Sequence, residues 1–186
     1  MELIVSLTGA SGVIYGLRLL EVLKSIKGHN VHLIISENAK KLIEFETELD
    51  IEDVLKNSNE FYKNSDLSAI IASGSKMIDA MVIIPCSMST AAKINAGIAD
   101  NLIVRTADVC LKEKRRLILV PRETPINTTH LTNLLSLSQK GVLILPAMPG
   151  FYHKPQVISD QVDFIVGKVL DNLRIPHKLY RRWGGV

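Results

Sequence analysis

Short apolar runs alternate with segments of helical periodicity along this chain, and the alternation strongly constrains its fold. The runs are rich in Val, Ile and Leu, as strands buried on both faces are, and they span residues 3–8, 31–36, 81–85, 117–121 and 142–146. Apolar residues three and four apart predict helices over residues 13–27, 38–48, 89–97, 101–114, 127–140 and 159–173. The pattern predicts an α/β fold, a doubly wound parallel sheet flanked by helices.

Length and composition favour one domain. The 186 residues, 47% of them hydrophobic, are enough for one substantial core and too few for two ordinary domains. No repeat, linker or low-complexity stretch divides the chain, so we expect a single domain over residues 1–186. Residues 50–68 are polar, and we expect them to form a mobile excursion from the sheet.

Charge, cysteines and hydropathy exclude several classes of protein. The 22 basic and 19 acidic residues are spread along the chain and leave a net charge of +3, too little for a nucleic-acid groove. Cys86 and Cys110 have neither metal-ligand nor disulfide spacing, and no His, Asp or Glu cluster indicates a metal site. No apolar run reaches membrane-spanning length, and the chain starts in a predicted strand without a leader. We therefore expect a cytoplasmic protein that binds neither nucleic acid nor membrane.

Polar residues follow the ends of the predicted strands, where parallel sheets bind ligands. Gly9 permits close approach of a ligand, and Ser11 lies where the first helix starts, so this turn favours a phosphate. Ser11 as a simple N-cap is the alternative. The glycine spacing of 9, 12 and 16 departs from the dinucleotide fingerprint, and Ser36 stands where a ribose-binding acidic residue would follow the second strand. Nicotinamide binding is therefore not expected.

Two later strand ends carry further candidate site residues. Three of the five apolar runs end in proline, and we expect these prolines to end strand pairing. Ser87, Ser89 and Thr90 offer hydroxyl groups to a mononucleotide phosphate or a flavin edge, with a capping cluster as the alternative. Glu123 lies between two prolines beside Arg122 and is placed to act as a general acid or base. An exposed Arg122–Glu123 ion pair of little energetic value is the alternative.

A second anion site is predicted from more distant residues. Arg105 and Lys112 fall on one face of a predicted helix about two turns apart, where they either hold an anion or are simply solvated. The basic run 112–116 is also typical of a solvated helix end. In the last loop, Tyr152 can donate its hydroxyl to a phosphate, and Phe151 or Tyr152 can enclose an apolar group.

Several of these motifs together resemble the UbiX-type flavin prenyltransferases. They occur in order over nearly the whole chain: LTGASG, ASGS at residues 72–75, PCSMST, ADNLIVRTADVCLKEKRRLILVPRETP, LPAMPGFYHKPQ and the terminal RRWG. The resemblance implies a Rossmann-like flavoprotein fold and a metal-independent transfer of a dimethylallyl group from dimethylallyl phosphate to reduced FMN. The product would be prenylated FMN, bonded at flavin N5 and C6, which serves UbiD-type decarboxylases. It also implies a large homo-oligomer, commonly a dodecamer.

The resemblance assigns roles to individual positions. FMN binding falls to Gly9, Ala10, Ser11, Ser36, Ser87, Met88, Ser89, Thr90 and Arg122. Catalysis falls to Ser11 and Glu123 at the reacting centre and to Arg105 and Lys112. Arg105 and Lys112, together with Tyr152 and Lys168, match the family's prenyl-phosphate contacts. Trp183 matches an aromatic residue that helps to enclose the site. The family usually has an arginine at the position of Lys168. Lysine keeps the charge but loses the bidentate fork, which affects the choice between mono- and diphosphate donors.

Two other functions are compatible with a flavin site. One is an FMN-dependent cysteine decarboxylase, a class that typically has a catalytic histidine after the first helix and a Pro-Ala-Ser-Ala-Asn-Thr loop. Here the loop reads PCSMST, and residues 42–51 contain no histidine. The other is a carrier that binds FMN without chemistry, which would not need a carboxylate at Glu123.

Overall fold

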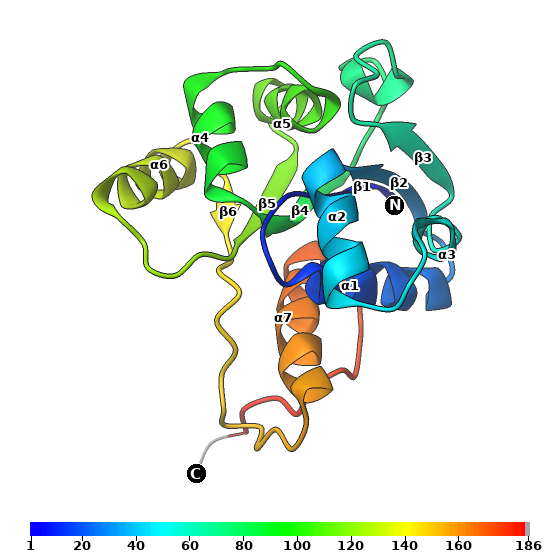
Figure 1. Ribbon diagram of the computed structural model, residues 1–186, viewed down its shortest axis with the longest axis vertical. Coiled ribbons are helices and arrows are strands. Elements are labelled where there is room, and N and C mark those ends of the chain that lie inside the picture. The colour runs from blue at the N-terminus through cyan, green and yellow to red at the C-terminus, as the bar shows by residue number, and fades with distance from the viewer. Residues whose placement is uncertain (185–186) are drawn as a thin grey trace.

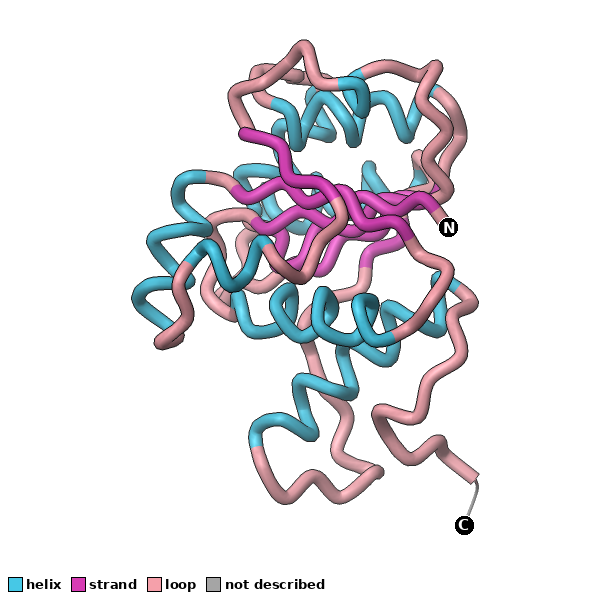
Figure 2. The backbone as a smooth tube through the Cα atoms, turned by 90° about the vertical axis from the view of Figure 1, so that its right-hand side faces the viewer, coloured by secondary structure: helices cyan, strands magenta, loops and turns pink. Residues whose placement is uncertain are grey.

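The computed structural model describes residues 1–184 and contains one six-stranded, all-parallel sheet between layers of helices (Figures 1 and 2). The strands lie in the order β3-β2-β1-β4-β5-β6. Their bounds are β1 (Glu2–Leu7), β2 (Asn30–Ile35), β3 (Glu60–Lys63), β4 (Ala80–Cys86), β5 (Arg116–Pro121) and β6 (Leu143–Ile144). The chain order reverses between β1 and β4, so a ligand crevice is expected beyond the carboxyl ends of these two strands. The predicted doubly wound α/β fold is confirmed.

Alternation of side chains along the strands divides the core into two halves. Leu3 and Val5 of β1 contribute to the half covered by α1 and α7, and Ile4 contributes to the half covered by α4, α5 and α6. The helices are α1 (Val13–Ser25), α2 (Glu37–Glu46), α3 (Ile51–Leu55), α4 (Met88–Ala96), α5 (Leu102–Lys112), α6 (Thr128–Gln139) and α7 (Ile158–Leu173), with a 3₁₀ turn at Ile70–Ala72. Helices α5 and α7 therefore lie on opposite faces of the sheet.

Residues 50–68 were expected to leave the fold as a mobile excursion, and this expectation is wrong. They form α3 and the edge strand β3, which pairs with β2 from His32↔Glu60 to Ile35↔Lys63. The segment is polar because an edge strand has one neighbour and remains partly exposed to water.

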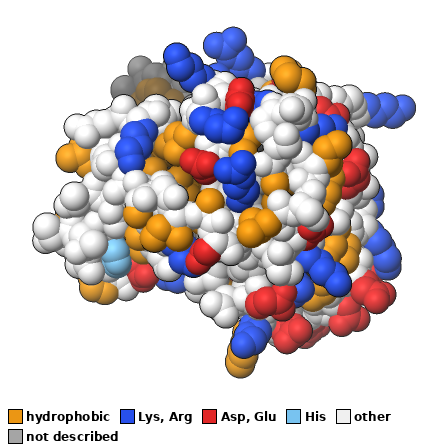
Figure 3. Space-filling view, turned by 90° about the horizontal axis from the view of Figure 1, so that it is seen from above, with side chains coloured by type: hydrophobic (Ala, Val, Ile, Leu, Met, Phe, Trp, Pro, Cys, Tyr) orange, Lys and Arg blue, Asp and Glu red, His pale blue; other side chains and the backbone are white. Residues whose placement is uncertain are grey.

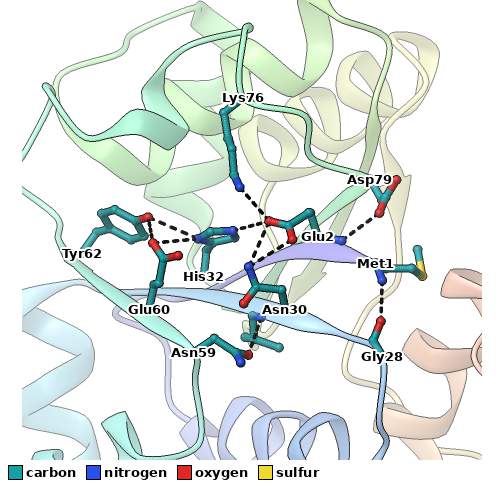
Figure 4. A network of polar contacts seen from close by, with 11 residues as sticks. Met1, Glu2, Gly28, Asn30, His32, Asn59, Glu60, Tyr62, Lys76 and Asp79 are labelled. Carbon is teal, nitrogen blue, oxygen red and sulfur yellow. Dashed lines mark hydrogen bonds and ion pairs between the residues drawn. The ribbon is translucent and has the colours of Figure 1, made fainter.

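A polar network joins β3 to the start of the sheet (Figure 4). His32 of β2 is fully buried, with Nε2 2.8 Å from Oε2 of Glu2 and Nδ1 3.3 Å from the hydroxyl of Tyr62. The Lys76 ammonium lies 2.9 Å from the same Glu2 carboxylate. The network thus links three strands with the segment that precedes β4.

We predict that Glu2 makes folding stability depend on acid. Hydrogen bonds from His32, Lys76 and Asn30 lower its pKa from an ordinary 4.5 to about 2. Because the folded pKa is the lower one, this stability is complete above pH 4.5 and is lost as the pH falls toward 2. The pKa difference alone corresponds to about 3 kcal/mol, but the side chain is 34% exposed, so we expect about 1 kcal/mol after solvent screening.

Urea denaturation near neutral pH and near pH 3 measures this effect. Glu2→Gln should lower the free energy of unfolding at neutral pH and lose less stability than the wild type on acidification. The exposed Glu44, changed to Gln, is the matched control. Equal acid losses in the wild type and Glu2→Gln would contradict the role of Glu2.

Proline ends one strand as predicted and behaves differently in two others. β5 ends at Pro121, whereas β4 continues through Pro85 to Cys86, and β6 is only two residues long and ends before Pro146. The chain beyond β6 keeps contact with β5, because the amides of Leu145 and Ala147 donate to the carbonyls of Leu119 and Pro121 at 2.8 and 3.0 Å. It then runs to α7, which extends from the body of the molecule (Figure 1).

The surface seen from above carries basic and acidic side chains together, with apolar ones between them (Figure 3). None of the helices within residues 1–184 has both the length and the apolarity that crossing a membrane requires.

Candidate functional site

A cavity of about 430 Å³ lies beyond the carboxyl ends of the strands. Its walls come from the loops after β1, β2, β4 and β5 together with the start of α5 and α6, so the switch in strand order positions it. The lining residues are Thr8, Gly9, Ser36, Asn38, Ser87, Met88, Ser89, Thr90, Lys93, Asn101, Glu123 and His130. Seven of the predicted site residues are among them: Gly9, Ser36, Ser87, Met88, Ser89, Thr90 and Glu123.

The loop after β4 holds its hydroxyl groups through buried bonds. Thr8 donates from Oγ1 to the carbonyl of Pro85 at 2.8 Å and accepts from the amide of Ser87 at 2.8 Å. Ser87 in turn caps α4, accepting from the amide of Thr90 at 3.2 Å. The alternative of a capping cluster is therefore correct for Ser87, which lines the cavity at the same time.

The loops after β1 and β2 approach closely. Ser36 caps α2 by accepting from the amide of Ala39 at 3.2 Å. A Cβ atom on Gly9 would lie 2.7 Å from Cβ of Asn38, so only glycine fits there without a shift. Because α2 and α4 both begin at this cavity, their N-terminal dipoles favour an anionic group.

The start of α1 differs from the sequence-based expectation. Ser11 is not its N-cap; Gly12 is, with a left-handed backbone at φ 96°. This turn was expected to favour a phosphate, but the amides of Gly12 and Val13 both donate to the Glu46 carboxylate, at 2.8 and 3.1 Å. Glu46, at the end of α2, thus places a carboxylate beside the Ser11 loop, and only the tertiary structure reveals it.

Arg122 and Glu123 do not pair with each other. Arg122 donates from Nε to the carbonyl of Ser11 at 2.9 Å and so joins the loop after β5 to the loop after β1. Glu123 is half-buried and accepts from the amide of Thr124 at 3.1 Å. Its carboxylate thus lines the cavity and forms no ion pair with another residue of 1–184, in contrast to the alternative of an exposed ion pair.

Arg105 and Lys112 share helix α5, as predicted, but do not line the cavity. Arg105 donates from Nε to the carbonyl of Ala72 at 3.3 Å and pairs with Asp108 at 3.2 Å. Lys112 pairs with Glu113. Both cations are half-exposed; Arg105 contacts the 3₁₀ turn, and the Lys112 ammonium lies near Gly74, just after that turn.

Tyr152, Lys168 and Trp183 form part of an aromatic cluster at the end of the chain. The rings of Tyr152 and Trp183 meet edge to face, with centroids 5.6 Å apart. The Lys168 ammonium lies 5.6 Å from the ring centre of Phe164 and 5.4 Å from that of Tyr180. A side-chain hydrogen bond with Tyr180 raises the pKa of Lys168.

Two groups of predicted phosphate contacts are therefore separated within one chain. Lys168 lies on α7 and Arg105 on α5, and these helices cover opposite faces of the sheet. Ala10, Ser11 and Arg122 lie next to the cavity without lining it.

Five lining residues were not predicted as site residues: Thr8, Asn38, Lys93, Asn101 and His130. Asn101 follows a helix-capping pattern and accepts from the amide of Val104 at 3.3 Å. Nδ1 of His130 is buried without a hydrogen-bond partner, which a sequence does not reveal. Within residues 1–184, no group of three or more His, Cys, Asp and Glu side chains is arranged to hold a metal ion.

The fold and the cavity define a flavoprotein: the flavoprotein family model matches residues 1–175. The flavin prenyltransferase UbiX of Methanocaldococcus jannaschii is 49% identical over 186 residues, covering all of both chains. This chain belongs to the UbiX family of flavin prenyltransferases.

Two solved structures are similar over the whole chain. One is a dodecameric FMN-dependent UbiX-like decarboxylase from Escherichia coli O157:H7, with 46% identity, a TM-score of 0.98 and complete coverage of both chains. The other is AnUbiX in complex with FMN and dimethylallyl pyrophosphate, with 39% identity, a TM-score of 0.97 and coverage of 100% of this chain and 98% of that one.

The cavity fits FMN by the chemistry of its lining. Hydroxyl groups of Ser36, Ser87, Ser89 and Thr90 surround two helix N-termini, a combination that suits a phosphate and a ribityl chain. The unpartnered Nδ1 of His130 and the close approach at Gly9 are consistent with a site shaped for a ligand.

Proposed function

We propose that this protein transfers a dimethylallyl group from dimethylallyl phosphate to reduced FMN and so makes prenylated FMN, bonded at N5 and C6. Full-length identity of 49% to a flavin prenyltransferase supports the reaction. One structural observation carries it: Glu123 presents an unpaired, half-buried carboxylate in a cavity whose other walls suit FMN. Bound FMN supplies the carbon and nitrogen atoms that accept the prenyl group.

The side chains divide the chemistry between proton transfer and charge stabilisation. Glu123 moves protons at flavin N5 and at the leaving phosphate, with Ser11 beside it. Negative charge develops on the phosphate as the allylic bond breaks, and Arg105, Lys112, Lys168 and Tyr152 stabilise it.

The separation of these cations supports a homo-oligomeric enzyme. Because α5 and α7 lie on opposite faces of the sheet, one chain does not gather Arg105 and Lys168 at a single point. We therefore propose that neighbouring subunits of a dodecamer complete the phosphate site and exclude water from it. Trp183, 61% exposed, is available to help enclose it.

The recipient of the product is a UbiD-type decarboxylase, and both partners act in the cytoplasm. A carrier for FMN is the second candidate function, because the cavity fits FMN whether or not chemistry follows. The cysteine-decarboxylase alternative has less support, since this chain lacks both its histidine and its loop sequence.

An activation assay separates the enzyme from the carrier. The protein is incubated anaerobically with reduced FMN, with or without dimethylallyl phosphate, and the released flavin is added to a UbiD-type decarboxylase that lacks its cofactor. Decarboxylation only when dimethylallyl phosphate was present supports the enzyme. No decarboxylation under either condition, with protein shown to have bound FMN, would support the carrier.

Lys168 should determine how well the prenyl donor binds. Lys168→Met is expected to raise KM for dimethylallyl phosphate about tenfold, because one charge-assisted contact is lost, with FMN affinity unchanged. Lys168→Arg should restore donor binding and improve use of dimethylallyl diphosphate, because the guanidinium is bidentate. Steady-state kinetics with both donors measure this. An unchanged KM in Lys168→Met would remove Lys168 from the donor site.

A further inference from the structure

A second hollow lies at the opposite end of the sheet, where the strands begin. Its volume is about 940 Å³, and it is bounded by the start of β4 and β5, by residues that follow α5 and α6, and by the last turn of α7. It shares no lining residue with the cavity described above. The proposed prenyl transfer makes no use of it.

Four basic side chains line this hollow: Lys114, Arg115, Arg116 and Arg174. None of them forms an ion pair within the described part of the chain. The hollow therefore carries concentrated positive charge on a protein whose overall charge is nearly balanced.

The two carboxylates of the hollow are engaged elsewhere. Asp79 accepts from the amide of Glu2 at 2.8 Å (Figure 4). Asp171 accepts from Tyr180 at 2.6 Å and from Arg182 at 2.6 Å. Burial opposes ionisation of Asp171, yet these bonds and one from His177 lower its pKa to about 2. Neither carboxylate neutralises the four cations.

The backbone at two of the cations is unusual. Lys114 and Arg174 have left-handed backbones, with φ of 53° and 59°, in positions after helices that favour glycine. A side chain in this conformation costs about 1 kcal/mol relative to glycine. Neither side chain makes a hydrogen bond to another described residue. At Gly141, which follows α6 and lines the same hollow, the left-handed position is occupied by glycine, as is usual after a helix.

A helix terminus accounts for Arg116, which donates from Nη1 to the carbonyl of Asn172 in the last turn of α7, but not for Lys114 or Arg174. A basic residue near a helix C-terminus is favourable, but the terminal carbonyls here already have backbone partners. The amides of Arg115, Val142 and Ile175 donate to the carbonyls of Cys110, Leu137 and Leu170 at 2.8, 3.1 and 2.9 Å. After α6 the corresponding cation is Lys140, whose ammonium donates to the carbonyl of Asn95 and does not line the hollow.

We propose that this hollow binds a small anion that carries a diphosphate group. Guanidinium nitrogens match phosphate oxygens, and Arg115 and Arg116 each keep nitrogens beyond the one that donates to the backbone carbonyl of Gly74 or Asn172. Lys114 and Arg174 supply charge from the rim.

Calorimetric titration of the FMN-loaded protein with inorganic diphosphate tests the proposal. Lys114→Gly/Arg174→Gly removes two cations while placing glycine where the backbone favours it, so folding should be retained. Lys154→Gly is the matched control, because Lys154 is also left-handed, at φ 56°, and lies outside the hollow. Diphosphate can also bind at the prenyl-donor site, so Lys168→Met identifies that contribution.

We expect the double variant to bind diphosphate at least about tenfold more weakly at the hollow, with Lys154→Gly and Lys168→Met retaining that binding. Unchanged affinity in the double variant would overturn the proposal. So would loss of all diphosphate binding in Lys168→Met, or binding of poly-glutamate in place of diphosphate. Prenyl transfer is assayed in parallel and should be unchanged in the double variant.

Discussion

Glu123→Gln should bind FMN as the wild type does and form prenylated FMN about a hundredfold more slowly or worse. The amide keeps the shape of the side chain and its bond to the Thr124 amide, but it cannot exchange a proton. Loss of a general acid or base typically slows a reaction by about 10²–10⁴-fold. The structure strengthens this expectation, because Arg122 is bonded to Ser11 and does not hold Glu123 in an ion pair.

Two measurements check the result. Flavin titration gives the affinity for FMN, and anaerobic single-turnover kinetics give the rate of prenyl transfer. Glu48→Gln, at an exposed position outside the cavity, is the control for a general effect of losing one carboxylate. Turnover at the wild-type rate in Glu123→Gln would remove Glu123 from the mechanism.

Gly16→Ala should destabilise the protein by about 3 kcal/mol. Gly16 is buried on α1, and a Cβ atom there would lie 2.4 Å from the carbonyl oxygen of Ile84 and 2.9 Å from Cγ of Leu7. Because the closest atom belongs to the backbone of β4, α1 must move away from the sheet. This movement would also disturb Gly12 and Ser11, so FMN affinity should fall as well.

Chemical denaturation with and without FMN measures both effects. Gly184→Ala makes the same chemical change where no atom lies within 4 Å, and it should leave stability unchanged. A loss of less than about 0.5 kcal/mol in Gly16→Ala would mean that α1 adjusts without cost.

The sheet was predictable because its strands are buried on both faces and therefore read as apolar runs. Edge elements were not predictable, because β3 has one neighbour and is therefore polar. The contact between its Tyr62 and His32 of β2 is seen only once the strands are paired. For β6 the prediction was too long: the apolar run covers residues 142–146, but the strand is only Leu143–Ile144.

The sequence predicted the cavity-lining residues well at positions where one residue both caps a helix and lines the cavity. Ser36 and Ser87 cap helices and line the cavity together. Glu46 escaped notice because it lies 34 residues from Gly12, whose amide it accepts. The separation of Arg105 from Lys168 was equally hidden, because a sequence does not show which face of the sheet a helix covers.

Mass spectrometry of the flavin released after anaerobic incubation with reduced FMN and dimethylallyl phosphate tests the central claim most directly. We predict a flavin heavier by one five-carbon unit, formed by the wild type and nearly absent with Glu123→Gln. Unchanged FMN, released from protein shown to have bound it, would contradict prenyl transfer.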